Sequence, residues 1–122
     1  MGMKLSDIDA SFEAEVRRLM DLSEADLYAE IAPADTAFDL QGRIAAGKEA
    51  LSRVLHNGRQ NICETYHKNK SAVRDASDLV RVLTDSLGLV VAAAGFKVPV
   101  IPVAVLIFKV GIEKVCPTKQ TA

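Results

Sequence analysis

Residues Leu87 to Gly111 form an almost uninterrupted apolar stretch, LGLVVAAAGFKVPVIPVAVLIFKVG, which is broken only by two lysines and two prolines. Such a stretch must be buried against its own chain, against a partner protein or in a bilayer. As a single membrane span it would place Lys97 near the middle of the bilayer, at a cost of about 2.5–3.5 kcal/mol. As two spans, each arm falls short of the roughly 20 apolar residues required. A membrane is therefore a possible but disfavoured surrounding.

The stretch instead predicts a buried helical hairpin with Lys97 at its exposed tip. Gly95 ends the first arm, because Pro99 and Pro102 each lack an N–H and disfavour helix in the residue before them. Pro102 fits the first turn of the second arm, which we expect to be a helix from Val103 to about Cys116. Short β-structure in the proline-containing part is the alternative, since Val and Ile are dense there.

Ahead of the hairpin, apolar residues recur every three or four positions, which is the pattern of amphipathic helices. We expect these helices to begin after Ser6, after Ser23, after Asp35 or Thr36, and at Ser71. Together with the hairpin they predict an all-α fold, a four- to five-helix bundle with a buried C-terminal hydrophobic helical hairpin. The chain is long enough to bury a core, and we expect residues 1–122 to form a single helical domain.

The third of these helices is unusual in two respects. Its apolar stripe continues from Leu40 past the Asn57-Gly58 pair to about His67, which predicts one long helix even though Asn-Gly can also end a helix. Its first half is rich in glycine and alanine. Because such residues have small side chains, we expect another backbone to approach this half closely.

Composition excludes some functions and suggests a compartment. The formal net charge is -1, so the chain lacks the general electrostatic attraction on which nucleic-acid binding depends, and we expect no nucleic-acid partner. The first residues are acidic and contain no apolar signal-peptide region. Cys63 and Cys116 stand 53 positions apart in no recognisable framework. We therefore expect reduced thiols and a cytoplasmic protein.

Two patterns resemble chemical motifs without completing them. Residues 42–49 read G-x-x-x-x-G-K, as in a phosphate-binding loop, but Glu49 replaces the Ser or Thr that would hold Mg²⁺. Cys63 and His67 lie one helical turn apart, and they would make a metal site only if Cys116 supplied a third ligand. The carboxylates share their helix faces with arginines and do not pair as acid and base. We therefore expect no catalytic residues, no cofactor, no metal and no enzymatic activity.

The second arm of the hairpin is apolar on every side, and such a helix needs neighbours on every side. Five helices in 122 residues provide too few, so we expect this arm to be covered by another protein, by a second copy of the chain, or by both. The candidate contact residues in this arm and in the connection before it are Phe96, Val98, Ile101, Leu106 and Phe108.

A second candidate contact lies at the acidic beginning of the chain. Residues 1–39 contain ten acidic and three basic residues. The candidate contact residues in this region are Asp9 and Glu13, which belong to the first expected helix. These observations favour a non-enzymatic protein–protein interaction or regulatory module, homo-oligomeric or part of a complex. Two alternatives stay open: a membrane-active protein that inserts its hairpin, and an immunity-like or antitoxin-like protein that binds a basic partner.

Overall fold

The computed structural model describes residues 5–33, 39–95 and 98–116, with side chains from Ala10 onwards. Within these ranges the protein is helical and contains no strand, which confirms the all-α class and excludes β-structure over residues 98–108. In chain order the elements are α1 (Leu5–Met20), α2 (Glu24–Ile31), α3 (Leu40–Asn69), the short 3-10 helix η1 (Lys70–Ala72), α4 (Ala76–Ala94), α5 (Val100–Val110) and α6 (Ile112–Val115).

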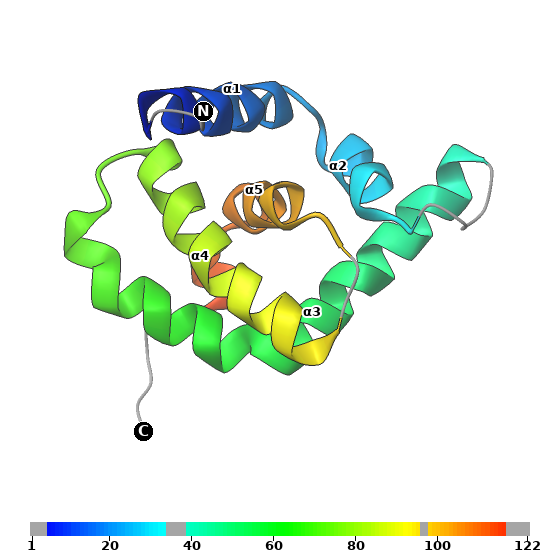
Figure 1. Cartoon of the computed structure of the whole chain (residues 1–122). Coiled ribbons are helices and arrows are strands. Elements are labelled where there is room, and N and C mark those ends of the chain that lie inside the picture. The colour runs from blue at the N-terminus through cyan, green and yellow to red at the C-terminus, as the bar shows by residue number, and fades with distance from the viewer. Residues whose placement is uncertain (1–4, 34–38, 96–97, 117–122) are drawn as a thin grey trace.

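Helix α5 is the central element of the molecule. In Figure 1 it lies in the middle of a frame formed by α1, α2, α3 and α4. Six consecutive residues, Pro102 to Ile107, are buried, and α5 packs against α1, α2, α4 and α6. The chain itself therefore supplies most of the neighbours that an apolar helix needs. Its two ends remain half-buried, at Val100, Ile101 and from Phe108 to Val110, and coverage of these parts by a partner stays a prediction.

Polar side chains define where the helices begin. The Ser23 hydroxyl accepts a hydrogen bond from the Asp26 amide at 3.1 Å, so α2 begins where the sequence predicts. The cap of α3 is Asp39, whose carboxylate accepts a hydrogen bond from the Gly42 amide at 3.3 Å. The expected positions Asp35 and Thr36 lie outside the described residues. The fourth helix does not open at Ser71. That residue belongs to η1, and α4 begins after Asp75, whose carboxylate accepts from the Asp78 amide at 2.9 Å.

Helix α3 is continuous through Asn57 and Gly58, as the apolar stripe predicts. Two of its glycines mark close contacts. A Cβ atom at Gly47 would overlap the backbone carbonyl of Tyr28 in α2, and a Cβ atom at Gly58 would lie 2.5 Å from Cγ1 of Val90 in α4. Small residues in α3 therefore set how closely α2 and α4 can approach it.

The second half of the apolar stretch differs from its expected boundaries. Helix α5 begins before Pro102, at Val100, because a proline in the first turn removes an N–H that has no partner within the helix. The expected helix from Val103 to Cys116 is also interrupted. Gly111 has φ +115, a backbone conformation that favours glycine, and it separates α5 from α6.

Helix α5 contains 11 residues, so it is about 16 Å long at the α-helical rise. Among the described helices, none is long and apolar enough to cross a membrane.

Candidate interaction surface

The second half of α4 is apolar on its outer side as well as on its inner side. Leu83, Leu87 and Val90 point inward and are buried at helical spacing. Beyond Asp85 the helix carries no charged residue, and its exposed residues there are Gly88, Leu89, Ala92, Ala93 and Ala94. The first four of these residues are named here the α4 ridge. A surface helix ordinarily presents polar residues at such positions, so the ridge departs from the usual amphipathic pattern.

Leu89 is the prominent side chain of the α4 ridge. It is 67% exposed, compared with 54% for Leu40, the other large hydrophobic residue classed as exposed in the described part of the chain. Gly88 has no atom within 4 Å of the position that a Cβ would occupy. An exposed leucine side chain therefore lies beside small residues, and the surface next to it is not covered by other side chains.

A shallow groove of about 280 Å³ runs between the ridge and α3. Leu89, Val90 and Ala93 line one side of it, and Asn57 and Asn61 line the other. The Asn57 amide nitrogen donates to the Arg53 carbonyl at 2.9 Å, which holds that side chain along the surface of α3. The site thus has an apolar floor and a polar edge, the arrangement found in protein–protein interfaces.

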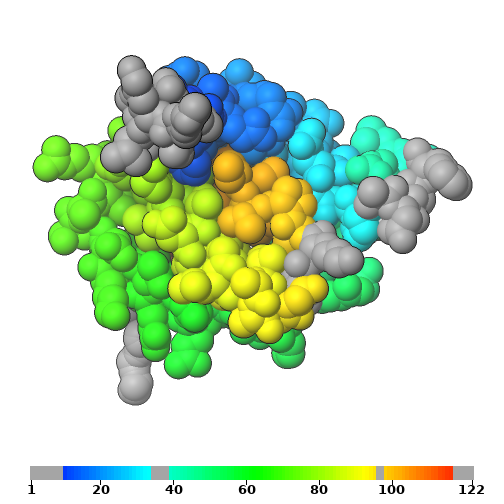
Figure 2. All heavy atoms as spheres, viewed as in Figure 1, coloured from blue at the N-terminus to red at the C-terminus, as the bar shows by residue number. Residues whose placement is uncertain are grey.

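The residues expected to form a contact surface in the second arm occupy different environments. Leu106 is completely buried, so it belongs to the core and is not available to a partner in this fold. Val98, Ile101 and Phe108 are half-buried and pack against the core, and Phe96 lies outside the described residues. Figure 2 shows part of α5, in orange, open to solvent above the yellow second half of α4.

The first helix presents less negative charge to a partner than its number of acidic residues indicates. The side chain of Asp9 lies outside the described part of the structure. Glu13 is exposed and lies 3.9 Å from Arg17 within the same helix. Exposed pairs of this kind contribute little to stability, and they reduce the net charge presented to a partner.

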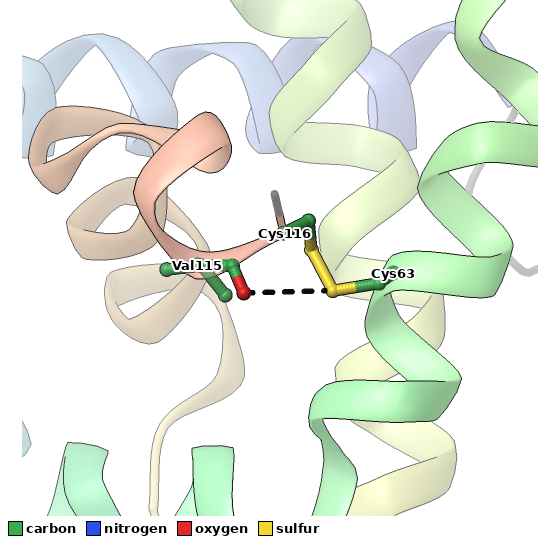
Figure 3. The surroundings of a disulfide bond; sticks show 3 residues. All are labelled: Cys63, Val115 and Cys116. Carbon is green, nitrogen blue, oxygen red and sulfur yellow. Dashed lines mark hydrogen bonds between the residues drawn. A yellow bond between two sulfur atoms is a disulfide. The ribbon is translucent and has the colours of Figure 1, made fainter. Parts of the chain in front are cut away.

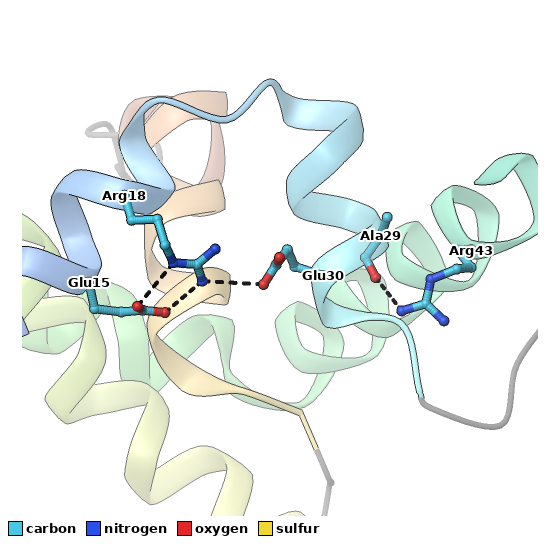
Figure 4. A network of polar contacts seen from close by, with 5 residues as sticks. All are labelled: Glu15, Arg18, Ala29, Glu30 and Arg43. Carbon is cyan, nitrogen blue, oxygen red and sulfur yellow. Dashed lines mark hydrogen bonds and ion pairs between the residues drawn. The ribbon is translucent and has the colours of Figure 1, made fainter.

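Other acidic groups join α1 to α2, as Figure 4 shows. The Arg18 guanidinium donates to both carboxylate oxygens of Glu15, at 2.8 and 3.2 Å, and also lies 3.5 Å from Glu30. The hydrogen bond from Arg18 lowers the pKa of Glu15, while Glu15 and Glu30 together raise the pKa of Arg18. Of these contacts, the pair between Arg18 and Glu30 joins α1 to α2, and the charges concerned are engaged within the same chain.

The two cysteines form a disulfide, so the expectation of reduced thiols was wrong for this structure. Cys63 in α3 and Cys116 after α6 have Cα atoms 5.4 Å apart, and Figure 3 shows the bond crossing between the two segments. The sequence separation of 53 positions gives no sign that the two residues are close in space, because their proximity depends on how α5 and α6 return to α3. His67 is exposed, and its ring lies against Tyr66, with the ring centroids 5.2 Å apart.

Residues that could bind a metal do not gather in the described part of the chain, where no three His, Cys, Asp or Glu side chains converge. The phosphate-loop-like residues 42–49 lie within α3, so their backbone N–H groups are in a helix and not in a loop.

No protein-family model, curated protein or solved structure matches this chain significantly. The functional assignment therefore depends on the geometry alone. The α4 ridge was missed from the sequence because the apolar residues after Ser86 were all assigned to the buried hairpin. The available signal was the lack of any charged residue from Ser86 to Phe96. A helix with one buried face and one solvated face normally carries charged or polar residues within a stretch of this length.

Proposed function

We propose that this protein is a non-enzymatic interaction or regulatory module that binds a second copy of itself or another protein through the α4 ridge. The observation that supports the proposal is the exposure of Leu89 beside Gly88, Ala92 and Ala93. Contiguous apolar surface on a folded protein marks a site where another molecule binds.

The chemistry of the ridge suits a helical or extended protein segment. Burying a leucine side chain contributes about 1.5–3 kcal/mol, so docking onto Leu89 would yield useful binding energy. The small residues around it would let a partner backbone approach closely. Asn57 and Asn61 at the edge of the groove offer amide donors and acceptors that can pair with a partner's polar groups.

The paired arrangement of α4 and α5 belongs to the same proposal. We infer that the two helices act as a hairpin within a bundle, connected by residues 95–99, with α5 as its buried arm. The contacts between α4 and α5 support this view. In such a hairpin the core fixes α4 from the inside, so the ridge is held rigid on the outside, and a rigid surface loses little entropy on binding.

The proposal is tested by replacing Leu89 with lysine and comparing it with a matched control, Leu40→Lys. Both side chains are mostly exposed, so neither variant should unfold, and circular dichroism verifies this. We expect light scattering to show that the Leu89→Lys variant loses self-association, or loses a partner captured by the unmodified protein. The Leu40→Lys variant should keep it.

Two other results would redirect the assignment. If neither variant changes association, the α4 ridge is not the binding surface. If the unmodified protein is a monomer that sediments with phospholipid vesicles, the membrane-active alternative takes its place. Binding to a basic partner that is lost on replacing Glu13, and kept on replacing Leu89, would favour the immunity-like alternative.

We propose the cytoplasm as the compartment. Cytosolic glutathione and thioredoxin keep most thiols reduced, and disulfides there are usually transient or redox-sensing. In this setting the Cys63–Cys116 bond would form reversibly. A bond that stays oxidised in the cell would place the protein in an oxidising compartment instead.

A further inference from the structure

Helix α6 has few connections to the rest of the molecule. It contains four residues, and the amides of Lys114, Val115 and Cys116 donate to the carbonyls of Gly111 and Ile112, within the same segment. Its attachment to the core consists of the buried side chains of Ile112, Val115 and Cys116 and of the disulfide to α3. A helix of this length is not stable alone, so these attachments decide whether α6 stays in place.

Gly111 gives the segment a natural point of rotation. Its φ of +115 lies in a region that glycine adopts readily, and it follows the last turn of α5 directly. Rotation there would detach α6 while α5 remains among its own neighbours α1, α2 and α4. Ordering the residues after Gly111 costs conformational entropy for each of them, and the burial of three side chains opposes this cost. The covalent bond adds to this attachment by keeping the two segments together.

We infer that the Cys63–Cys116 disulfide is a redox switch: when it is intact it holds α6 on α3, and its reduction by a dithiol releases α6 and uncovers the adjoining end of α5. This inference goes beyond the proposed binding function and does not depend on it. Cys116 is 1% exposed whereas Cys63 is partly exposed, so Cys63 is the more accessible of the two residues to a reductant.

The exchange balances in electrons and protons. A thiolate of the dithiol reductant attacks the Cys63 sulfur, breaks the S–S bond and expels Cys116 as a thiolate, which takes up a proton. The second thiolate of the reductant then attacks the mixed disulfide, so that Cys63 leaves as a thiolate and is protonated. Two electrons pass to the protein, and the reductant becomes a disulfide.

In the reduced form the Cys63 thiol has a hydrogen-bond acceptor close by. The Cys63 sulfur lies 3.8 Å from the Val115 carbonyl oxygen, as Figure 3 shows, so a reduced Cys63 could donate a weak hydrogen bond to that oxygen. Such a bond is weaker than the covalent link that it replaces. It would slow the release of α6 without preventing it.

Hydrogen exchange of the full chain, oxidised and after treatment with dithiothreitol, tests the switch. We expect reduction to speed exchange at the amides of residues 114–116 by about tenfold or more and to leave them at least about tenfold faster than the amides of α4 and α5, which exchange only through global unfolding, because α6 opens separately from the rest of the fold. Equal protection of α6 in both states would overturn the inference. Exchange of α6 in the reduced protein at the same rate as α4 and α5 would also overturn it, since α6 would then open only with the whole molecule.

A second measurement does not depend on reductant. The Cys63→Ala variant leaves Cys116 as the single thiol, and its reaction with iodoacetamide reports on α6 directly. With α6 released, we expect Cys116 to react at a rate within about tenfold of that in denaturant. A reaction slowed by about a thousandfold or more would show that α6 stays packed without the bond, and would contradict the switch.

Discussion

Single glycines determine how tightly the helices pack, and Gly47 and Gly88 lie in opposite surroundings within their helices. Gly47 in α3 faces the backbone of Tyr28, and no side-chain movement could make room for a methyl group there. Gly88 in α4 is exposed and has open space around it. The same substitution should therefore have opposite effects at these two positions.

We expect Gly47→Ala to lower the free energy of unfolding by about 1–3 kcal/mol, because α2 must move away from α3. Gly88→Ala should raise it by about 0.5–1 kcal/mol, because alanine loses less backbone entropy in a helix than glycine does. Urea denaturation of both variants measures the two changes. Equal effects at both positions would contradict the close contact between α2 and α3.

At the scale of the element, α5 owes its stability to its surroundings. It has no side-chain cap, and its N-cap residue is Pro99. Valine and isoleucine, which are weak helix formers, make up much of its length. Burial of Pro102 to Ile107 compensates for these weaknesses, so the core contacts of α5 and not its intrinsic propensity keep it helical.

Replacing Leu106 by alanine tests this dependence. We expect a loss of about 2–5 kcal/mol in the free energy of unfolding, because Leu106 is fully buried and its truncation leaves a cavity. Leu89→Ala in α4 serves as the control and should change the same quantity by less than about 0.5 kcal/mol, because that side chain is mostly exposed. Thermal or urea unfolding distinguishes the two. A small effect at Leu106 would mean that α5 is not the centre of the core.

For the whole molecule, the disulfide is a covalent constraint between distant parts of the chain. It joins residues 53 positions apart and closes a loop that contains the C-terminal end of α3, together with η1, α4, α5 and α6. Such a closed loop restricts the unfolded chain, and the unfolded state is where most of its stabilising effect arises.

We expect the oxidised protein to be more stable than the reduced protein by about 4 kcal/mol, the value for a loop of this length in the chain-entropy description. Urea denaturation with and without dithiothreitol measures the difference. The Cys63→Ala variant should resemble the reduced form in both conditions. A difference near zero would indicate that the unfolded chain is already restricted around these two residues.

The sequence predicted those features that depend on local patterns. The start of α2 after Ser23 and the continuity of α3 through Asn57-Gly58 follow from capping and periodicity, and both are confirmed. The all-α class follows in the same way. The start of α4 was predicted wrongly because Ser71 and Asp75 are both residue types that cap helices, and in the structure Asp75 caps α4 while Ser71 lies in η1.

Features that depend on assembly could not be predicted. The pairing of Cys63 with Cys116 requires the return of α6 to α3, which no local pattern encodes. The same is true of the surroundings of α5. Whether Leu106 or Leu89 faces solvent depends on which helices cover each of them, and both residues lie in the same apolar stretch.

The central position of α5 has a consequence for synthesis on the ribosome. The helices that surround α5 are made before it, so during translation α1 to α4 can assemble only around an empty centre. Their inward faces stay uncovered until Val100 to Val110 has left the exit tunnel. Until then the nascent chain exposes apolar surface to which chaperones can bind and through which it can aggregate. It completes its fold only after its last long helix is released.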